Sequence, residues 1–203
     1  MPRPVVLRPR FGIVLTCLVW AICVFCVLSL AFGPGVIDAL RYLPAFALAA
    51  FACWAVFWAP AVSLDLSGVS LRNIVRTRRI TWPAITAVET KYTLTIHAGR
   101  ARYTAWAAPA PSRFAVSRAA KADLRHLPRS TYGPEGTVAL GDIPSSDSGL
   151  AALHVRRQWE ALREAGYLES GLVEGAGVVT TWHRGTLIAL AALALATLVG
   201  ALA

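Results

Sequence analysis

Alternation of apolar and polar residues marks the centre of the chain as β-structure. Residues 62–66 alternate, Ser67-Gly68 turns the chain, and residues 69–72 repeat the alternation on the way back. Residues 92–107 show the same pattern around a second turn at Ala98-Gly99. Period-two alternation interrupted by short turns is typical of half-buried antiparallel strands. The pattern therefore predicts four or more strands in a small antiparallel sheet or barrel.

Long apolar runs lie on both sides of these strands. Two uncharged runs precede them, at 11–32 and 43–60, and a third, 186–203, ends the chain. A helix needs about 20 apolar residues to cross a bilayer, so each of the first two is predicted to span. The third run is shorter, and two interpretations stay open for it: a span, or a helix that lies on the membrane or packs in a bundle.

Composition and charge agree with a membrane protein. The chain has 203 residues, of which 56% are hydrophobic, and a formal net charge of +9. Arg3, Arg8 and Arg10 precede the first run, most other basic residues lie between the second and third runs, and Arg41 lies between the first two. The positive-inside rule then predicts a multi-pass protein of the cell membrane. Its N-terminus and central domain would be cytoplasmic, and its C-terminus would lie at the outer face.

The domain organisation follows from these patterns. We expect a basic tail with a transmembrane hairpin over 1–60, a cytoplasmic domain over 61–168, a linker over 169–185 and a third transmembrane helix over 186–203. Within the domain, we expect strands at about 61–107, a variable loop at 109–148 and a helix at 149–166. Residues 113–127 of the loop fit either a basic amphipathic helix on an anionic membrane or a disordered linker.

The helix at 149–166 is predicted from its caps and its apolar stripe. Asp147 or Ser148 can cap its start and Gly166 suits its end. The apolar stripe contains Ala151, Val155, Trp159 and Leu162. The opposite, polar side contains Arg156, Glu160 and Arg163. A tryptophan in the stripe needs a large apolar surface, so we expect the helix to pack on the sheet.

A set of short sequence pieces carries a family resemblance. In order, they are Leu64-Asp65, Gly68-Val69, Arg72-Asn73, the basic stretch 76–79, and the segment Ile80-Thr81-Trp82-Pro83-Ala84-Ile85. The pattern resembles the PH domain of the low-molecular-weight protein antigen 6 family, found in actinobacterial membrane proteins. The resemblance implies a PH-like fold in a membrane context and supplies no catalytic residues. The long insert before the helix departs from a compact PH domain.

Motifs for catalysis, metals or cofactors are lacking in the sequence. The histidines have no ligand spacing, and no phosphate-binding loop or nucleophile elbow occurs. Cys23 and Cys26 form a CxxC inside the first apolar run, where packing is favoured over a redox or metal pair. We therefore expect no catalytic residue, no metal, no cofactor and no enzymatic activity. Nucleic acid is not expected as a partner either, because topology accounts for much of the positive charge.

Two functions remain open. In the first, the chain reverses at Ser67-Gly68 and returns to the bilayer, so that Arg76, Arg78 and Arg79 form a basic turn that contacts anionic headgroups. In the second, the domain is a membrane scaffold that docks a protein partner. A PH fold serves both functions. For the core we expect four large side chains, Ile80, Trp82, Ile85 and Trp159.

Overall fold

The structure is a computed structural model that describes residues 5–33, 35–109, 131, 140–142, 146–168 and 177–202. The chain divides into two compact units. One contains Met1–Arg8 and Ala61–Thr181, and the other contains Pro9–Pro60 and Trp182–Ala203. The segment 113–127, for which a helix or a linker was expected, lies outside the described residues.

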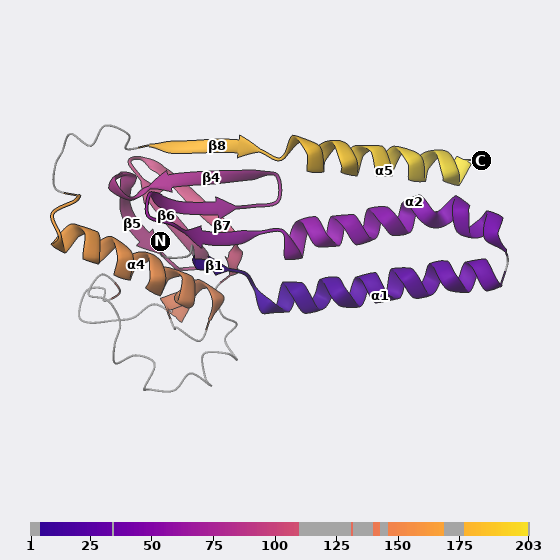
Figure 1. Cartoon of the computed structure of the whole chain (residues 1–203), viewed down its shortest axis with the longest axis horizontal. Helices are drawn as coiled ribbons and strands as arrows, with labels where there is room; N and C mark the ends of the chain where they lie inside the picture. Colours follow the sequence, from indigo (N-terminus) through magenta and orange to yellow (C-terminus); the bar gives the residue numbers. More distant parts are fainter. Residues whose placement is uncertain are drawn as a thin grey trace. The chain divides into compact units, whose positions relative to one another are not determined.

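The first unit contains two antiparallel sheets and a helix (Figure 1). The five-stranded sheet has the order β1-β2-β3-β4-β8, and the three-stranded sheet has the order β5-β6-β7. The strands are β1 (Val5–Leu7), β2 (Ala61–Leu64), β3 (Gly68–Arg72), β4 (Arg76–Thr81), β5 (Ile85–Glu89), β6 (Thr93–Ala98), β7 (Ala101–Pro109) and β8 (Val178–Trp182). The sheets thus extend beyond the 61–107 stretch in which alternation predicted strands.

Both edge strands of the larger sheet come from segments expected to be a tail and a linker. Strand β1 pairs with β2, with Leu7 opposite Val62. Strand β8 pairs with β4, because the Thr81 N–H donates to the Gly177 carbonyl at 3.2 Å and the Thr181 hydroxyl donates to the Thr77 carbonyl at 3.4 Å. These contacts run in opposite directions along the two strands, so the pairing is antiparallel.

The turn between β2 and β3 lies one residue earlier than the sequence predicts. The Asp65 N–H donates to the Gly68 carbonyl at 3.0 Å, which leaves Leu66-Ser67 as the two-residue turn. The Asp65 carboxylate stabilises it by accepting hydrogen bonds from the N–H groups of Ser67 and Gly68, at 2.8 and 2.9 Å. Gly68 is instead the first residue of β3, where a Cβ would collide with the backbone carbonyl of Ile80.

The turn between β6 and β7 lies one residue later than predicted. Ala98 pairs with Ala101, so Gly99-Arg100 forms the turn, and Gly99 has φ of +59°. That left-handed conformation favours glycine. The expected alternation holds for Leu94 and Ile96, which are buried, but Tyr92 lies before β6 and is 77% exposed.

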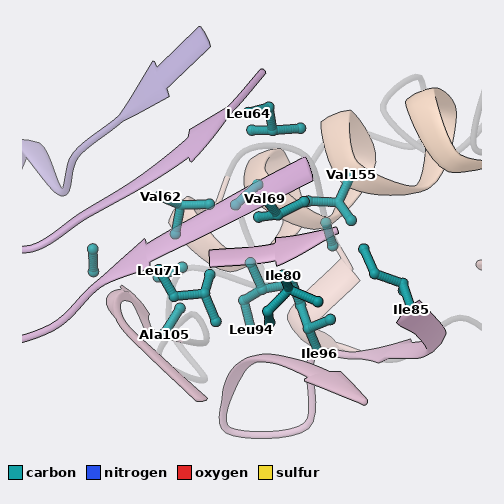
Figure 2. Packing of buried hydrophobic residues seen from close by; sticks show 14 of the residues in the cluster. Val62, Leu64, Val69, Leu71, Ile80, Ile85, Leu94, Ile96, Ala105 and Val155 are labelled. Carbon is teal, nitrogen blue, oxygen red and sulfur yellow. The ribbon is translucent and has the colours of Figure 1, made fainter. Parts of the chain in front are cut away.

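The core lies between the two sheets and the helix α4 (Asp147–Glu164) (Figure 2). Fully or nearly buried side chains from all three meet there, and they include Val62, Val69, Leu71, Ile80, Leu94, Ile96 and Val155. Of the four expected core residues, Ile80, Trp82 and Ile85 are buried, whereas Trp159 is half-buried at the margin of the same cluster. Burial of this kind is the main stabilising contribution to a domain of this size.

Helix α4 begins earlier than expected and is capped by a different residue. The Ser146 hydroxyl accepts from the Gly149 N–H at 3.0 Å, so Ser146 is the N-cap rather than Asp147 or Ser148. At the other end, the Gly166 and Tyr167 N–H groups donate to the carbonyls of Arg163 and Leu162. With Gly166 at φ of +78°, these two bonds form a Schellman motif.

Arg156 was expected on the polar side of this helix, but it is buried. Its guanidinium donates to the Asp142 carboxylate at 2.5 Å, to the Thr131 hydroxyl at 3.3 Å and to the Val88 carbonyl at 2.8 Å. Thr90 donates to the same carboxylate at 2.6 Å. These contacts of Arg156 therefore link α4 to Val88 of strand β5 and to Thr131 and Asp142 of the insert.

The second unit contains three helices that are long and apolar enough to cross a membrane. They are α1 (Arg10–Phe32), α2 (Val36–Cys53) continued by the π-helix η1 (Trp54–Trp58), and α5 (Arg184–Leu202). Helix α2 contacts both α1 and α5 (Figure 1). The second helix starts at Val36 rather than Leu43. It therefore includes Asp38 and Arg41, the charged residues that precede the uncharged run.

Close contacts join these helices. A Cβ at Gly12 of α1 would collide with the carbonyl of Phe57 in η1. The Trp20 indole stacks on Trp58, with ring centroids 5.9 Å apart, and its N–H donates to the Ala50 carbonyl at 3.0 Å. Internal partners of this kind satisfy polar groups that lipid cannot. The four cysteines are free thiols.

Candidate functional site

Three segments leave the larger sheet for the apolar helices, and they do so at one end of it. Leu7, the last residue of β1, lies opposite Val62, and the neighbouring Ala61 begins β2 opposite Arg72. Arg72 lies opposite Thr77, whose carbonyl accepts from Thr181 near the end of β8. The joints to the helices are only Arg8-Pro9, Ala59-Pro60 and His183. All three chain connections therefore leave from the same end of the domain.

The β3–β4 turn lies at this end and is fixed by Asn73. The Asn73 N–H donates to the Arg76 carbonyl at 3.0 Å, leaving Ile74-Val75 as a two-residue turn. The Asn73 amide also donates to the Thr104 carbonyl at 2.8 Å and accepts from the Trp106 N–H at 2.9 Å. Because Thr104 and Trp106 belong to β7, one side chain links the two sheets. This explains the asparagine of the Arg-Asn pair, whose role the sequence pattern did not reveal.

The residues Arg76, Arg78 and Arg79 form part of a strand and not the predicted basic turn. They belong to β4, which begins at the joined end and runs away from it. Successive side chains of a strand point to opposite faces, so Arg76 and Arg78 share a face and Arg79 lies on the other. The three arginines are therefore not one cluster.

Arg79 is directed toward the opposite end of the sheet. Its guanidinium donates to the Asp65 carboxylate at 2.7 Å and to the Ser67 hydroxyl at 2.7 Å, both in the β2–β3 turn. Partial burial of Asp65 opposes ionisation, but the hydrogen bonds from Ser67, the charge of Arg79 and the Gly68 N–H outweigh it and lower the pKa of Asp65. The charge of Arg79 is thus matched locally.

Arg78 lies over an aromatic ring near the joined end. Its guanidinium carbon is 4.9 Å from the ring centroid of Tyr103 on β7. Partial burial, followed by repulsion from Arg76, lowers the pKa of Arg78. The group stays cationic at neutral pH, and an anion placed beside Arg76 and Arg78 would relieve this repulsion.

Arg72 is a basic residue that the sequence pattern did not assign to the site. It ends β3 and lies opposite Thr77, next to Arg76 across the turn. Its Nε is buried and makes no hydrogen bond within the described part of the chain. We call Arg72, Arg76 and Arg78 the basic end of the domain. Arg72 pairs with Thr77 and therefore lies on the opposite face of the sheet to Arg76 and Arg78, so the three residues share an end of the sheet and not a face.

Comparison with known families supports the fold. Residues 59–157 match the family model of the bacterial PH domain. The chain contains a bacterial PH domain. The match begins just before β2 and ends within α4, so it covers the insert and leaves out β1, β8 and the three apolar helices. No curated protein and no solved structure matches the chain significantly.

The match confirms the bacterial PH resemblance that the residues from Leu64 to Ile85 suggest. The structure adds a physical reason for the pattern. Asp65 builds the first turn, Gly68 allows close approach to β4, and Asn73 joins the sheets. These are structural roles, and they explain how the PH fold presents the basic end without assigning it a ligand.

Proposed function

We propose that this protein is a non-catalytic integral membrane protein whose PH domain lies at the inner face of the cell membrane. There its basic end contacts anionic lipid headgroups. The partners are the bilayer and its anionic lipids, and no cofactor takes part. The observation that supports this best is that β1, β2 and β8 all join apolar helices at the end of the sheet that carries Arg72 and Arg76.

The length of the joints limits how far the domain can lie from the bilayer. The longest joint has two residues, Arg8-Pro9 or Ala59-Pro60, and an extended residue spans about 3.3 Å. If the three helices span the membrane, Arg72 and Arg76 lie within roughly a Debye length of the headgroups. The proposed cytoplasmic side follows from the basic residues beside the joints, among them Arg8, Arg10 and Arg184.

Electrostatics gives the contact a role other than recruitment. A basic residue near an anionic leaflet contributes about 1 kcal/mol, so the basic end contributes roughly 3 kcal/mol. Three spanning helices already hold the chain in the membrane irreversibly. The contact would instead orient the domain on its three joints and enrich anionic lipid around it.

The test measures anionic lipid retained by the full chain. The protein is reconstituted in nanodiscs of mixed phosphatidylglycerol and phosphatidylcholine, extracted gently, and its bound lipids are counted by native mass spectrometry. The wild-type chain should retain phosphatidylglycerol in preference to phosphatidylcholine. The triple change Arg72→Gln, Arg76→Gln and Arg78→Gln should reduce the preference several-fold, and raised salt should have the same effect.

The control changes equal charge elsewhere on the domain. Arg79 is paired with Asp65, Arg100 lies in the β6–β7 turn, and Arg157 lies on the exposed side of α4. The triple Arg79→Gln, Arg100→Gln and Arg157→Gln should leave the preference nearly unchanged. Equal losses in both triples, or no preference in the wild-type chain, would show that the basic end has no special contact with lipid.

A further inference from the structure

The PH domain has a small pocket between the end of α4 and the start of the 3-10 turn η2 (Trp82–Ala84). Its volume is about 230 Å³, and Trp82, Pro83, Ile85, Trp159, Arg163 and Leu168 line it. Pockets for complete small molecules are usually about 300–1,000 Å³. This one is therefore sized for a single side chain of a larger ligand.

Its lining combines aromatic rings with one cation. Trp82 and Trp159 supply two indoles, and the Arg163 guanidinium carbon is 5.8 Å from the Trp159 ring centroid. Arg163 is the one charged residue among the described side chains that line the pocket. A carboxylate would match the charge of this lining, and an apolar group beside it would contact the half-buried indole of Trp159.

Two exposed apolar residues belong to segments that are joined to the pocket lining. Leu66, at the tip of the β2–β3 turn, is 71% exposed, and Tyr167, next to Leu168, is 70% exposed. The turn of Leu66 is attached to the pocket wall, because the Trp82 N–H groups donate to Asp65 and Ser67 in that turn. Clusters of Trp, Tyr and Arg around a desolvated pocket are typical of the residues that carry most of the energy of protein interfaces.

The pocket lies at the end of the sheet opposite to the basic end. Strand β4 begins with Arg76 at the basic end and reaches Trp82 only after Thr81, a distance of about 17 Å at ~3.3 Å per residue. The joints to the apolar helices all leave from the other end. The pocket and the basic end are therefore separate sites of the PH domain, and the lining of the pocket, two indoles beside one cation, favours an acidic protein segment with an apolar side chain.

From this geometry we infer that the pocket docks a short acidic segment of a protein partner. One apolar side chain of the segment packs against the half-buried indole of Trp159, and a neighbouring carboxylate pairs with Arg163. This site is separate from the basic end, so it does not depend on the proposed contact with lipid.

The test uses labelled peptides with a single apolar anchor, Leu, Phe or Trp, flanked by Asp, and matched peptides with Asn in place of Asp. Binding to the full chain in nanodiscs of neutral phosphatidylcholine is measured by fluorescence anisotropy, so anionic lipid plays no part. At least one Asp peptide should bind about two- to fivefold more tightly than its Asn counterpart, the effect expected for one exposed charged pair.

Two variants separate the pocket from general attraction to a basic protein. Arg163→Gln should abolish the difference between Asp and Asn peptides, since Arg163 is exposed and its change leaves the core intact. Arg157→Gln removes the same charge from the exposed side of the same helix and should preserve the difference. Trp159→Phe should weaken every peptide several-fold. Absence of binding, equal binding of the two peptide sets, or equal effects of Arg163→Gln and Arg157→Gln would overturn the inference.

Discussion

The indole N–H of Trp82 donates a hydrogen bond to the backbone carbonyl of Asp65 over 3.1 Å. The Trp82 backbone N–H also donates to Ser67, at 3.4 Å, so the tryptophan holds the β2–β3 turn from two sides. Trp82 itself is only 2% exposed. The two ends of the sequence pattern, Leu64-Asp65 and Ile80–Ile85, thus form one structural unit.

The first prediction separates the packing of Trp82 from its hydrogen bond. Trp82→Ala should lower the free energy of unfolding of the PH domain by about 3–5 kcal/mol, the range for deleting a large core aromatic. Trp82→Phe keeps a ring and loses the donor to Asp65, so it should cost about 1–3 kcal/mol. Urea unfolding of the full chain in micelles, followed by far-UV circular dichroism, measures both. Unchanged stability of Trp82→Phe would contradict the role of the hydrogen bond, and equal costs for the two variants would contradict the role of ring packing.

The second prediction concerns acid. The folded-state pKa of Asp65 is lowered below its ordinary value of 3.8, so the ionised carboxylate stabilises the fold above that pH. This contribution is lost as the pH falls through 3.8 and then through the lower folded-state pKa. Asp65→Asn should therefore be less stable than the wild-type chain at pH 6, and the difference should shrink below about pH 3.8. A difference that stays constant from pH 6 to pH 2.5 would exclude this linkage.

The third prediction concerns the amide that joins the sheets. Asn73→Ala removes both the donor to Thr104 and the acceptor for the Trp106 N–H. We expect a loss of about 1–3 kcal/mol and faster hydrogen exchange of the Trp106 amide. The Leu71 amide, in the centre of the other sheet, is the internal control and should exchange faster only by the global loss of stability. Unchanged exchange at Trp106 would show that Asn73 does not link the sheets.

Alternation predicted the central strands because a fully buried face forces a period of two on residues such as Val69, Leu71, Leu94 and Ile96. It placed the turns one residue off, because it took the glycines Gly68 and Gly99 as the markers of the turns. In the structure, Asp65 binds the amides of its own turn, and Gly68 serves a close contact with Ile80 in β4. That contact is between strands, so local sequence cannot reveal it.

The edge strands and the basic end were beyond sequence reasoning for a related reason. Strand β1 has only three residues beside an apolar run, and β8 is mostly exposed, so neither shows a buried face. Their pairing with β2 and β4 is long-range. Arg72 and Arg76 are close in sequence, but both lie at the joined end of the sheet only because the Ile74-Val75 turn reverses the chain between them.

Arg156 departs most from the prediction made for helix α4. A charged residue on the polar side of an amphipathic helix is expected to face water, but Arg156 is buried. Its partners Asp142 and Thr131 belong to the insert that precedes the helix, and Arg156 and Asp142 are each 4% exposed. Both charges are desolvated, so the net stabilisation of the pair is small even though its geometry is good. Breaking the pair is costly, because one charge then stays buried without compensation.

The final prediction follows from that asymmetry. Arg156→Met should destabilise the PH domain by about 3–5 kcal/mol, since it leaves Asp142 buried and uncompensated and deprives the Val88 carbonyl of its donor. Arg157→Met changes the neighbouring, exposed arginine and should alter stability by less than about 0.5 kcal/mol.

The double change Arg156→Met with Asp142→Leu removes both charges, so it should recover part of the loss. Recovery is incomplete because Thr90 and Thr131 also lose a partner. Urea unfolding of the wild-type chain, Arg156→Met, Asp142→Leu and the double variant measures the cycle, with Arg157→Met as the control. A double variant less stable than Arg156→Met alone would mean that the Asp142 carboxylate is not compensated mainly by Arg156.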